Sequence, residues 1–222
     1  MRDFVFKEQP SGDLEFIGDF EGLYQNVFDP WEQSAIKGDM SNYYYRSRKR
    51  LLDNIYPNDN SQILEIGSGL GFVTKLISDT YPLASCHGLD ISKTAVKKAS
   101  NLFPEIKFFV GDICSDTFNI PEKYDIVILS QLLWYILKKF PIALDNCSKI
   151  MNNSSELIIT QAFLKKPQKY AIDIIDGFHS LVKYLRLNLP NDMEIVFSDY
   201  DENDDFVHYH GIVILKKKQF FI

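Results

Sequence analysis

From residue 62 onward, the apolar and polar positions alternate between short buried strands and amphipathic helices. Strands are predicted where apolar and β-branched residues run together, at Gln62–Ile66, Ser85–Asp90, Lys107–Val110, Tyr124–Ser130 and Glu156–Gln161. Helices are predicted where apolar residues recur every three or four positions, at Leu70–Thr80, Ser92–Leu102, Ile142–Met151 and Ala171–Leu187. Regular strand-helix alternation predicts a parallel sheet covered by helices on both faces.

The last part of the chain departs from this alternation. Two predicted strands, Glu194–Ser198 and Phe206–Leu215, are joined by residues 199–205, a connection too short for a crossover helix. We therefore expect an antiparallel hairpin at the sheet edge, with its first strand parallel to the main strands. The prediction is a doubly wound, Rossmann-like α/β fold with a seven-stranded sheet.

Residues 1–60 follow a different pattern. Residues 1–40 are rich in aromatic residues, Gly and Asp and have no steady period, which favours short helices or an ordered lid over strands. A helix is predicted over Ser41–Ile55, and Pro57 and the polar residues after it end that helix. We expect residues 1–60 to form an N-terminal helical lid segment and residues 61–222 to form the core of one compact domain.

The most informative segment is the glycine-rich turn after the first predicted strand, which reads Glu65-Ile66-Gly67-Ser68-Gly69-Leu70-Gly71. Glycines are used where the backbone turns sharply and a ligand touches it, and ligands of open parallel sheets lie at this end of the strands. The dinucleotide fingerprint is GxGxxG, whereas the spacing here is GxGxG. The Glu65 carboxylate would repel a pyrophosphate and attract an ammonium group. An NAD-dependent reductase is the main rival interpretation.

This turn resembles motif I of class I methyltransferases, which use S-adenosylmethionine, and three later segments match the same family. Asp90 ends the second strand, where the resemblance implies a contact with the ribose hydroxyls. Asp112 follows the third strand, where the resemblance implies a contact with the adenine, and Ile113 would lie against the adenine ring. Ser130 ends the fourth strand, in the region that the family places beside the methyl group. The implied cofactor-binding residues of the core are Glu65, Gly67, Ser68, Gly69, Gly71, Asp90, Ile91, Asp112, Ile113 and Ser130.

The N-terminal segment is similar to the lid of the small-molecule N-methyltransferases of the nodulation and aminosugar type. The similarity lies in Asp29-Pro30-Trp31 and in Tyr44 to Arg48. It implies that Trp31 and Tyr44 line the cofactor pocket and that Arg48 meets the cofactor carboxylate, although plain packing of the lid onto the core is an equal alternative. That family often has Tyr-Glu at Tyr44-Tyr45 and a glutamate at Gln131, so the acceptor stays open.

The acceptor side offers weaker signals. Methyl transfer from a sulfonium needs an aligned acceptor, exclusion of water and sometimes a base. Tyr135, after the fourth strand, is a candidate acceptor contact, as is Gln161, and His208 is a candidate base because imidazole titrates near neutral pH. An inert edge-strand histidine is the more common case. Five acidic residues within 199–205 would attract a cationic amine, or simply keep the surface soluble.

Composition narrows the class of protein. The 222 residues carry a formal net charge of −6, and the basic run Arg46–Arg50 fits a solvated helix face better than a nucleic-acid patch. The three cysteines are scattered, which argues against disulfides and zinc, and we expect no metal. With no signal peptide and no apolar span, we expect a soluble cytoplasmic protein without a membrane partner.

Together these features predict an S-adenosylmethionine-dependent methyltransferase that acts on a small polar metabolite. An amine or amino-sugar nitrogen is favoured as the acceptor, and O-methylation of a sugar or similar metabolite is the closest alternative. A non-catalytic binding module is a more distant one. The oligomeric state is open.

Overall fold

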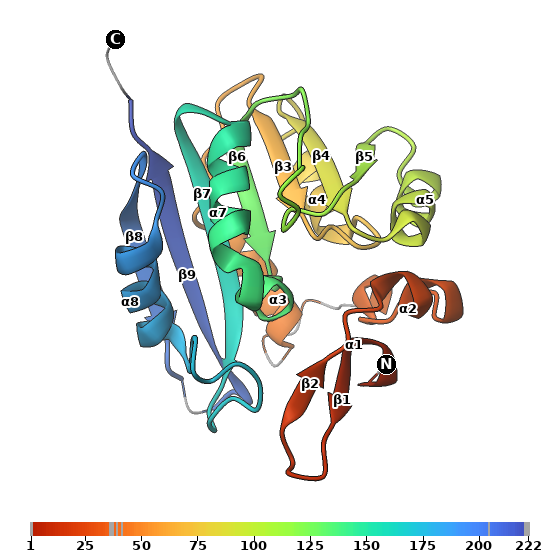
Figure 1. Cartoon of the computed structure of the whole chain (residues 1–222). Helices are drawn as coiled ribbons and strands as arrows, with labels where there is room; N and C mark the ends of the chain where they lie inside the picture. The colour runs from red at the N-terminus through yellow and green to blue at the C-terminus, as the bar shows by residue number, and fades with distance from the viewer. Residues whose placement is uncertain (1, 36–37, 39, 41, 204, 220–222) are drawn as a thin grey trace.

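A seven-stranded sheet forms the centre of the molecule (Figure 1). The structure is a computed structural model, and it describes residues 2–35, 38, 40, 42–203 and 205–219. The strand order is β5-β4-β3-β6-β7-β9-β8, and β9 is antiparallel to both of its neighbours. The strand bounds are β3 (Gln62–Ile66), β4 (Ser85–Asp90), β5 (Lys107–Val110), β6 (Tyr124–Ser130), β7 (Met151–Leu164), β8 (Met193–Asp201) and β9 (His208–Lys217). The other pairs between β5 and β7 are parallel.

Helices cover both faces of the sheet. One face carries α7 (Phe140–Ile150) and α8 (Phe178–Asn188), and the other carries α3 (Tyr43–Leu52) and α4 (Phe72–Thr80) (Figure 1). A fifth helix, α5 (Lys93–Leu102), packs along β4 and β5. In β7, Leu157 and Ile159 join the apolar cluster under α7 and α8, while Ile158 joins the cluster under α3. Burial on both faces explains why these strands are continuously apolar in the sequence.

The predicted doubly wound sheet and its edge hairpin are confirmed, with three differences in detail. Strand β7 is longer than expected and extends to Leu164. Helix α8 begins at Phe178 rather than at Ala171, because Ala171 has a φ of 49°, which a right-handed helix does not allow. Two short helical turns after β6, α6 (Leu133–Ile136) and η2 (Leu137–Lys139), were not expected.

The prediction of an N-terminal segment without strands is wrong. Residues 2–35 form α1 (Arg2–Val5), β1 (Phe6–Glu8), β2 (Leu14–Phe16), α2 (Phe20–Asn26) and η1 (Gln33–Ala35), and β1 pairs with β2 in an antiparallel hairpin. The rings of Phe6 and Phe16 lie 5.4 Å apart and both contact the ring of Tyr135. The hairpin thus depends on contacts with a distant part of the chain, which local periodicity does not reveal.

Helix α2 is fixed to the core through α5. The Glu21 carboxylate accepts hydrogen bonds from the hydroxyl of Ser92 and from the backbone and hydroxyl of Thr94, and these bonds lower its pKa to about 2. At the other end of α2, the Lys98 ammonium donates to the carbonyl of Tyr24. The N-terminal segment therefore has a defined position over the carboxyl ends of the strands. The boundary between this segment and the core, expected at residue 60, stays a prediction.

Within the described part of the chain, every helix is too short or too polar to cross a bilayer.

Candidate functional site

The glycine-rich turn follows β3 directly and has a shape that depends on glycine. Gly67 and Gly69 have φ values of 75° and 55°, in the left-handed region where glycine is favoured. A Cβ on Gly67 would lie 2.6 Å from the Leu132 side chain, and one on Gly69 would lie 2.5 Å from the Tyr24 hydroxyl. The backbone N–H of Gly69 donates to the Asp90 carboxylate at 2.8 Å, which ties the turn to the end of β4.

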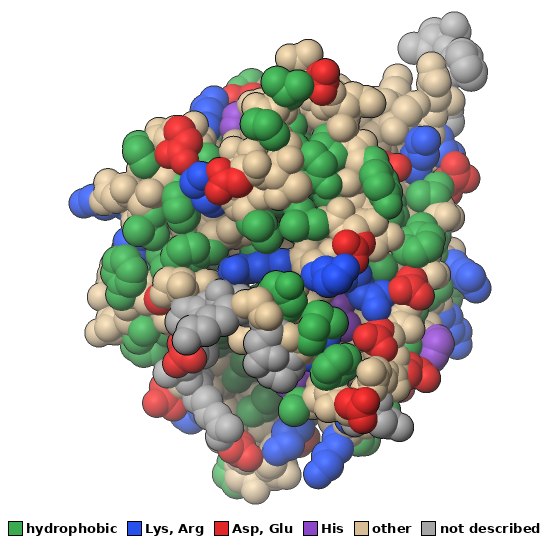
Figure 2. All heavy atoms as spheres, turned by 180° about the vertical axis from the view of Figure 1, so that it is seen from behind, with side chains coloured by type: hydrophobic (Ala, Val, Ile, Leu, Met, Phe, Trp, Pro, Cys, Tyr) green, Lys and Arg blue, Asp and Glu red, His purple; other side chains and the backbone are tan. Residues whose placement is uncertain are grey.

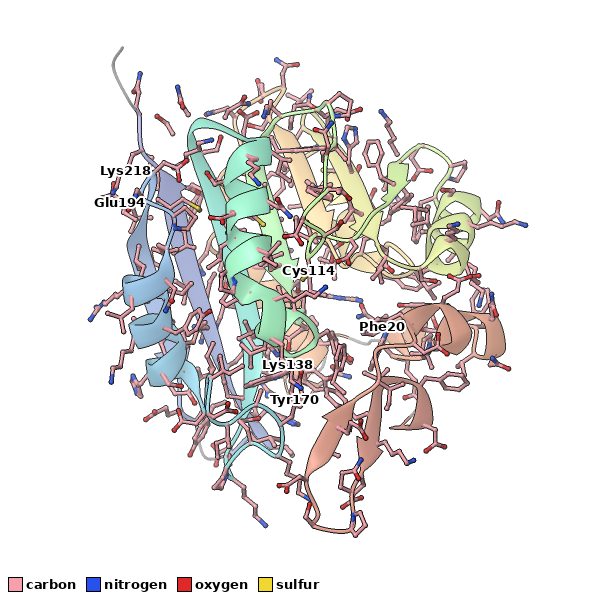
Figure 3. The ribbon with its side chains drawn as sticks, viewed as in Figure 1. Phe20, Cys114, Lys138, Tyr170, Glu194 and Lys218 are labelled. Atoms are coloured by element: carbon pink, nitrogen blue, oxygen red, sulfur yellow. The ribbon has the colours of Figure 1, made fainter. Side chains whose placement is uncertain are left out.

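A cavity of about 330 Å³ opens beside this turn at the ends of β4 and β5. The buried Asp90 carboxylate accepts backbone N–H groups from Gly69 and Ser92, and burial raises its pKa. Asp112 lines the same cavity and accepts from the backbone of Cys114. The rest of the wall is mainly apolar, and it includes Phe16, Phe20, Ile66, Ile91, Ile113 and Ile136. Figure 3 shows Phe20, Cys114, Lys138 and Tyr170 around the space between the N-terminal segment and the sheet.

A second, smaller cavity of about 70 Å³ lies on the other side of the turn. Its charged groups are Glu65, Arg48 and Asp29. Burial raises the pKa of Glu65 to about 8, although the Thr74 hydroxyl and the Arg48 charge favour its ionised form. Arg48 donates to the Gln33 amide oxygen at 2.7 Å, and its Nε has no hydrogen-bond partner among the described residues. Trp31, Tyr44, Ser68 and Ser130 complete this wall.

A third cavity, of about 260 Å³, lies between the β1–β2 hairpin and the ends of β7 and β9. Its wall is rich in aromatic side chains and amides. It includes Phe6, Tyr43, Tyr44, Gln131, Trp134, Gln161, Gln168, Tyr170 and His208. The ring of His208 contacts the ring of Tyr43, and burial lowers the pKa of this histidine. The imidazole is therefore uncharged at neutral pH.

Tyr135 lies where the three cavities meet, because it lines all of them. Its ring contacts those of Phe6, Phe16, Phe20 and Trp31, which come from the N-terminal segment. Burial raises the pKa of the Tyr135 hydroxyl well above its usual range. Tyr135 is thus a neutral hydrogen-bonding group at the junction rather than a base.

Gln131 forms the boundary between the second and third cavities. Its φ of 57° is unusual for a residue with a side chain, and it directs the amide into a hydrogen-bond network. The amide nitrogen donates to Ser47 Oγ and to His210 Nε2, both at 3.0 Å, and its oxygen accepts from the backbone of Ala162. Burial lowers the pKa of His210 to about 3, so this histidine stays neutral. The network holds the Gln131 side chain in one orientation.

The structure gathers the predicted cofactor residues and the candidates Tyr135, Gln161 and His208, with one exception. All of them line one of the three cavities except Gly71, whose added Cβ would meet the ring of Phe108. Gly71 is the N-cap residue of α4 and allows close packing there. Sequence reasoning missed Tyr24, Leu132, Gln168 and Tyr170 as wall residues, and it gave Gln131 no role. A positive φ at Gln131 has no signal in its residue type.

Several acidic residues of the loop 199–205 are paired, so the loop is not the free acidic surface that would attract a cationic amine. Asp199 and Asp201 belong to β8 and lie within ion-pair distance of Arg50 on α3, and Glu202 lies 3.6 Å from His179. Asp204 is outside the described residues. Figure 2 shows basic and acidic side chains mixed on the face opposite α7 and α8. No aspartate or glutamate is among the described residues that line the third cavity.

Comparison with known proteins identifies the domain. Residues 63–154 match the family described as "Methyltransferase domain", and they contain β3 to β6 with the glycine turn, Asp90 and Asp112. The match assigns residues 63–154, less than half of the chain, to a methyltransferase domain. The match to a methyltransferase domain, together with a solved neighbour that holds S-adenosyl-L-homocysteine, supports S-adenosylmethionine as the cofactor.

Three similar proteins extend the comparison. The protein 235L of Invertebrate iridescent virus 6, which has a methyltransferase name, is 32% identical over 125 residues, 56% of this chain and 46% of its own length. Phosphoethanolamine N-methyltransferase of Plasmodium falciparum is 31% identical over 146 residues, 64% of this chain and 52% of its own length. The chain therefore spans about half the length of these two curated relatives.

The third is a solved structure. N-methyltransferase NodS of Bradyrhizobium japonicum, in complex with S-adenosyl-L-homocysteine, superposes with a TM-score of 0.64 and 17% identity. The superposition covers 90% of this chain and 98% of that chain. At this identity the likeness shows a shared fold for the methyltransferase domain.

Proposed function

We propose that this protein transfers a methyl group from S-adenosylmethionine to a small polar metabolite, with an amine nitrogen as the acceptor. The observation that carries the proposal is the meeting of three cavities at Tyr135. Two of them flank the glycine turn, as an extended cofactor requires, and the third reaches the same junction from outside. Such an arrangement brings two ligands into contact at one point and excludes water from it.

The two cavities beside the turn fit the two ends of the cofactor. In the first, Asp90 would accept the ribose hydroxyls, while Asp112 and Ile113 would contact the adenine. In the second, Glu65 would hold the ammonium group and Arg48 the carboxylate of the methionine part. The fit is supported by Arg48 Nε and Ser68 Oγ, which are buried in this wall and lack a partner among the described residues. The cofactor supplies a methyl group on an already activated sulfonium.

Aromatic faces at the junction favour transfer to nitrogen. A neutral amine becomes positively charged as it takes the methyl group, and Tyr44 and Tyr135 lie on the boundary shared by the second and third cavities. Ring faces stabilise a cation by about 0.5–2 kcal/mol each. Among the curated relatives, one has an N-methyltransferase name and two have O-methyltransferase names, so the preference for nitrogen rests on the ring faces. Trp31 and Tyr44 would then act as part of the wall over the cofactor.

Transfer to oxygen is the second candidate, and His208 favours it. An alcohol needs a base to take its proton, and the uncharged imidazole of His208 lines the acceptor cavity. For an amine that binds in its neutral form, His208→Gln should change kcat less than about threefold. For an alcohol acceptor, the same change should lower kcat at least a hundred-fold. Measuring kcat of both proteins against pH separates the two reactions.

Binding of the demethylated cofactor tests the proposal directly. Isothermal titration calorimetry with S-adenosylhomocysteine should give a saturable signal with a Kd of about 1–100 µM. Methyl transfer is then followed with radiolabelled S-adenosylmethionine and a panel of amines and alcohols. Binding without transfer to any member would support a binding module, and absence of binding together with a fluorescence change of added NADH would support a reductase. Either result contradicts the proposed reaction.

A further inference from the structure

Two buried hydrogen-bond donors lie in the wall of the third cavity without partners. Gln168 and Tyr170 are 9% and 8% exposed, and both line this cavity. Gln168 Nε2 and the Tyr170 hydroxyl have no hydrogen-bond partner within the described ranges of the chain. A buried donor that stays unpaired costs about 1–3 kcal/mol. The methyl transfer proposed above gives neither group a role.

Lysine side chains lie near these two donors. Lys169 lines the cavity wall next to them, 3.9 Å from Glu8. The ammonium group of Lys138 lies 5.4 Å from the centre of the Tyr170 ring (Figure 3), and Lys138 and Lys139 are exposed at the edge of the neighbouring cavity. Within the part of the chain that the structure describes, neither Lys138 nor Lys139 has a carboxylate at ion-pair distance.

The part of the wall beside the first two cavities has a different character. There Gln131, Tyr44 and Tyr135 separate the third cavity from the cofactor cavities, and neutral aromatic and amide groups form the wall. The wall of the third cavity thus combines unpaired donors and Lys169 with the junction proposed for methyl transfer. A ligand that satisfies both parts of the wall must combine an anionic or strongly accepting group with the reacting atom.

We propose that Gln168, Tyr170 and Lys138 form an anion subsite, so that the acceptor is a small amine that also carries a carboxylate or a phosphate. The anion accepts hydrogen bonds from the Gln168 amide and the Tyr170 hydroxyl, and it is attracted by the ammonium groups of Lys138 and Lys169. Hydrogen bonds to a charged acceptor are roughly twice as strong as neutral ones. This inference rests on the proposed function, because it names the substrate class of the same cavity.

Three amines of similar length test the subsite. Calorimetry on the protein saturated with S-adenosylhomocysteine would compare β-alanine, aminopropyl phosphate and aminopropanol, which differ in carrying a carboxylate, a phosphate or a neutral hydroxyl. At least one of the two anionic amines should bind about tenfold or more tightly than aminopropanol. Its advantage should shrink as the salt concentration rises, because the lysines are exposed. Comparing the two anionic amines shows which anion the subsite accepts.

Variants assign the effect to these residues. Gln168→Leu combined with Lys169→Gln changes two residues that line the third cavity and are absent from the walls of the first two. This double variant should remove most of the preference for the anionic amine and leave the affinity for S-adenosylhomocysteine unchanged. Lys97→Gln makes the same charge change at an exposed position on α5 and should retain the full preference. Equal binding of all three amines, absence of binding by all three, or an unchanged preference in the double variant would overturn the subsite. If S-adenosylhomocysteine itself did not bind, the proposed function would fall together with it.

Discussion

Replacing Gly69 by arginine should weaken the binding of S-adenosylhomocysteine at least a hundred-fold, a loss of about 2.8 kcal/mol. Gly69 has a φ of 55°, and any Cβ there would lie 2.5 Å from the Tyr24 hydroxyl. Either Tyr24 or the turn would have to move, and the positive φ disfavours any side chain at this position. A shift of the turn would break the hydrogen bond from Gly69 to Asp90, the carboxylate proposed to hold the ribose. Isothermal titration calorimetry measures the loss of affinity.

A matched variant separates this local effect from general strain. Gly12 also has a positive φ, of 86°, but no atom lies within 4 Å of a Cβ added there. Gly12→Arg therefore introduces the same side chain and a comparable backbone penalty away from the turn. It should bind S-adenosylhomocysteine within about threefold of the original protein. If Gly69→Arg remained folded by circular dichroism and kept its affinity, the ligand would not lie on the glycine turn.

Replacing Glu65 by glutamine should have opposite effects on stability and on cofactor binding. The pKa of Glu65 is about 8 in the folded protein, against 4.5 for an unperturbed glutamate, chiefly because the carboxyl is buried. Between these two pH values the folded state binds more protons than the unfolded state, so stability falls as pH rises. The loss is on the order of 4 kcal/mol at pH 8. Glutamine carries no charge and should remove this pH dependence.

The ligand-free Glu65→Gln protein is therefore expected to melt at a higher temperature than the original protein at pH 8, and at a similar temperature below about pH 5. The variant should bind S-adenosylhomocysteine roughly ten- to a hundred-fold more weakly, because the ammonium group loses its carboxylate partner. Differential scanning fluorimetry with and without the ligand measures both effects. Glu194→Gln, at an exposed position on β8 far from the site (Figure 3), should change neither. A destabilised variant at pH 8 would contradict the high pKa of Glu65.

The parts of the site that lie on the main strands could be predicted because their signal is local. The glycine turn, Asp90 and Asp112 each follow a strand whose apolar run is visible in the sequence, and parallel strands place such ends along one edge. The role of each glycine was harder to predict. The GxGxG spacing gives its three glycines the same expected role, whereas Gly71 packs against Phe108 and lines none of the three cavities.

The third cavity could not be predicted because its wall is formed by segments that lie far apart in the sequence. Phe6 lies in a short hairpin whose partner contact is Tyr135, and Tyr170 follows the extended end of β7 in an irregular segment. Neither segment has a periodic pattern that sequence reasoning can use. The role of the acidic loop could not be predicted for a related reason. Its charge is visible in the sequence, but its pairing with Arg50 depends on how α3 packs.

The way the three cavity walls are assembled bears on how the proposed acceptor could be changed. Phe16 of the β1–β2 hairpin and Tyr170 in the segment after β7 both line the first cavity, so exchanging these whole segments would also disturb the proposed cofactor site. Leu14 and Gln168, from the same two segments, line the third cavity and are absent from the walls of the first two. Substitutions at these two positions should therefore alter the choice of acceptor and leave cofactor binding in place.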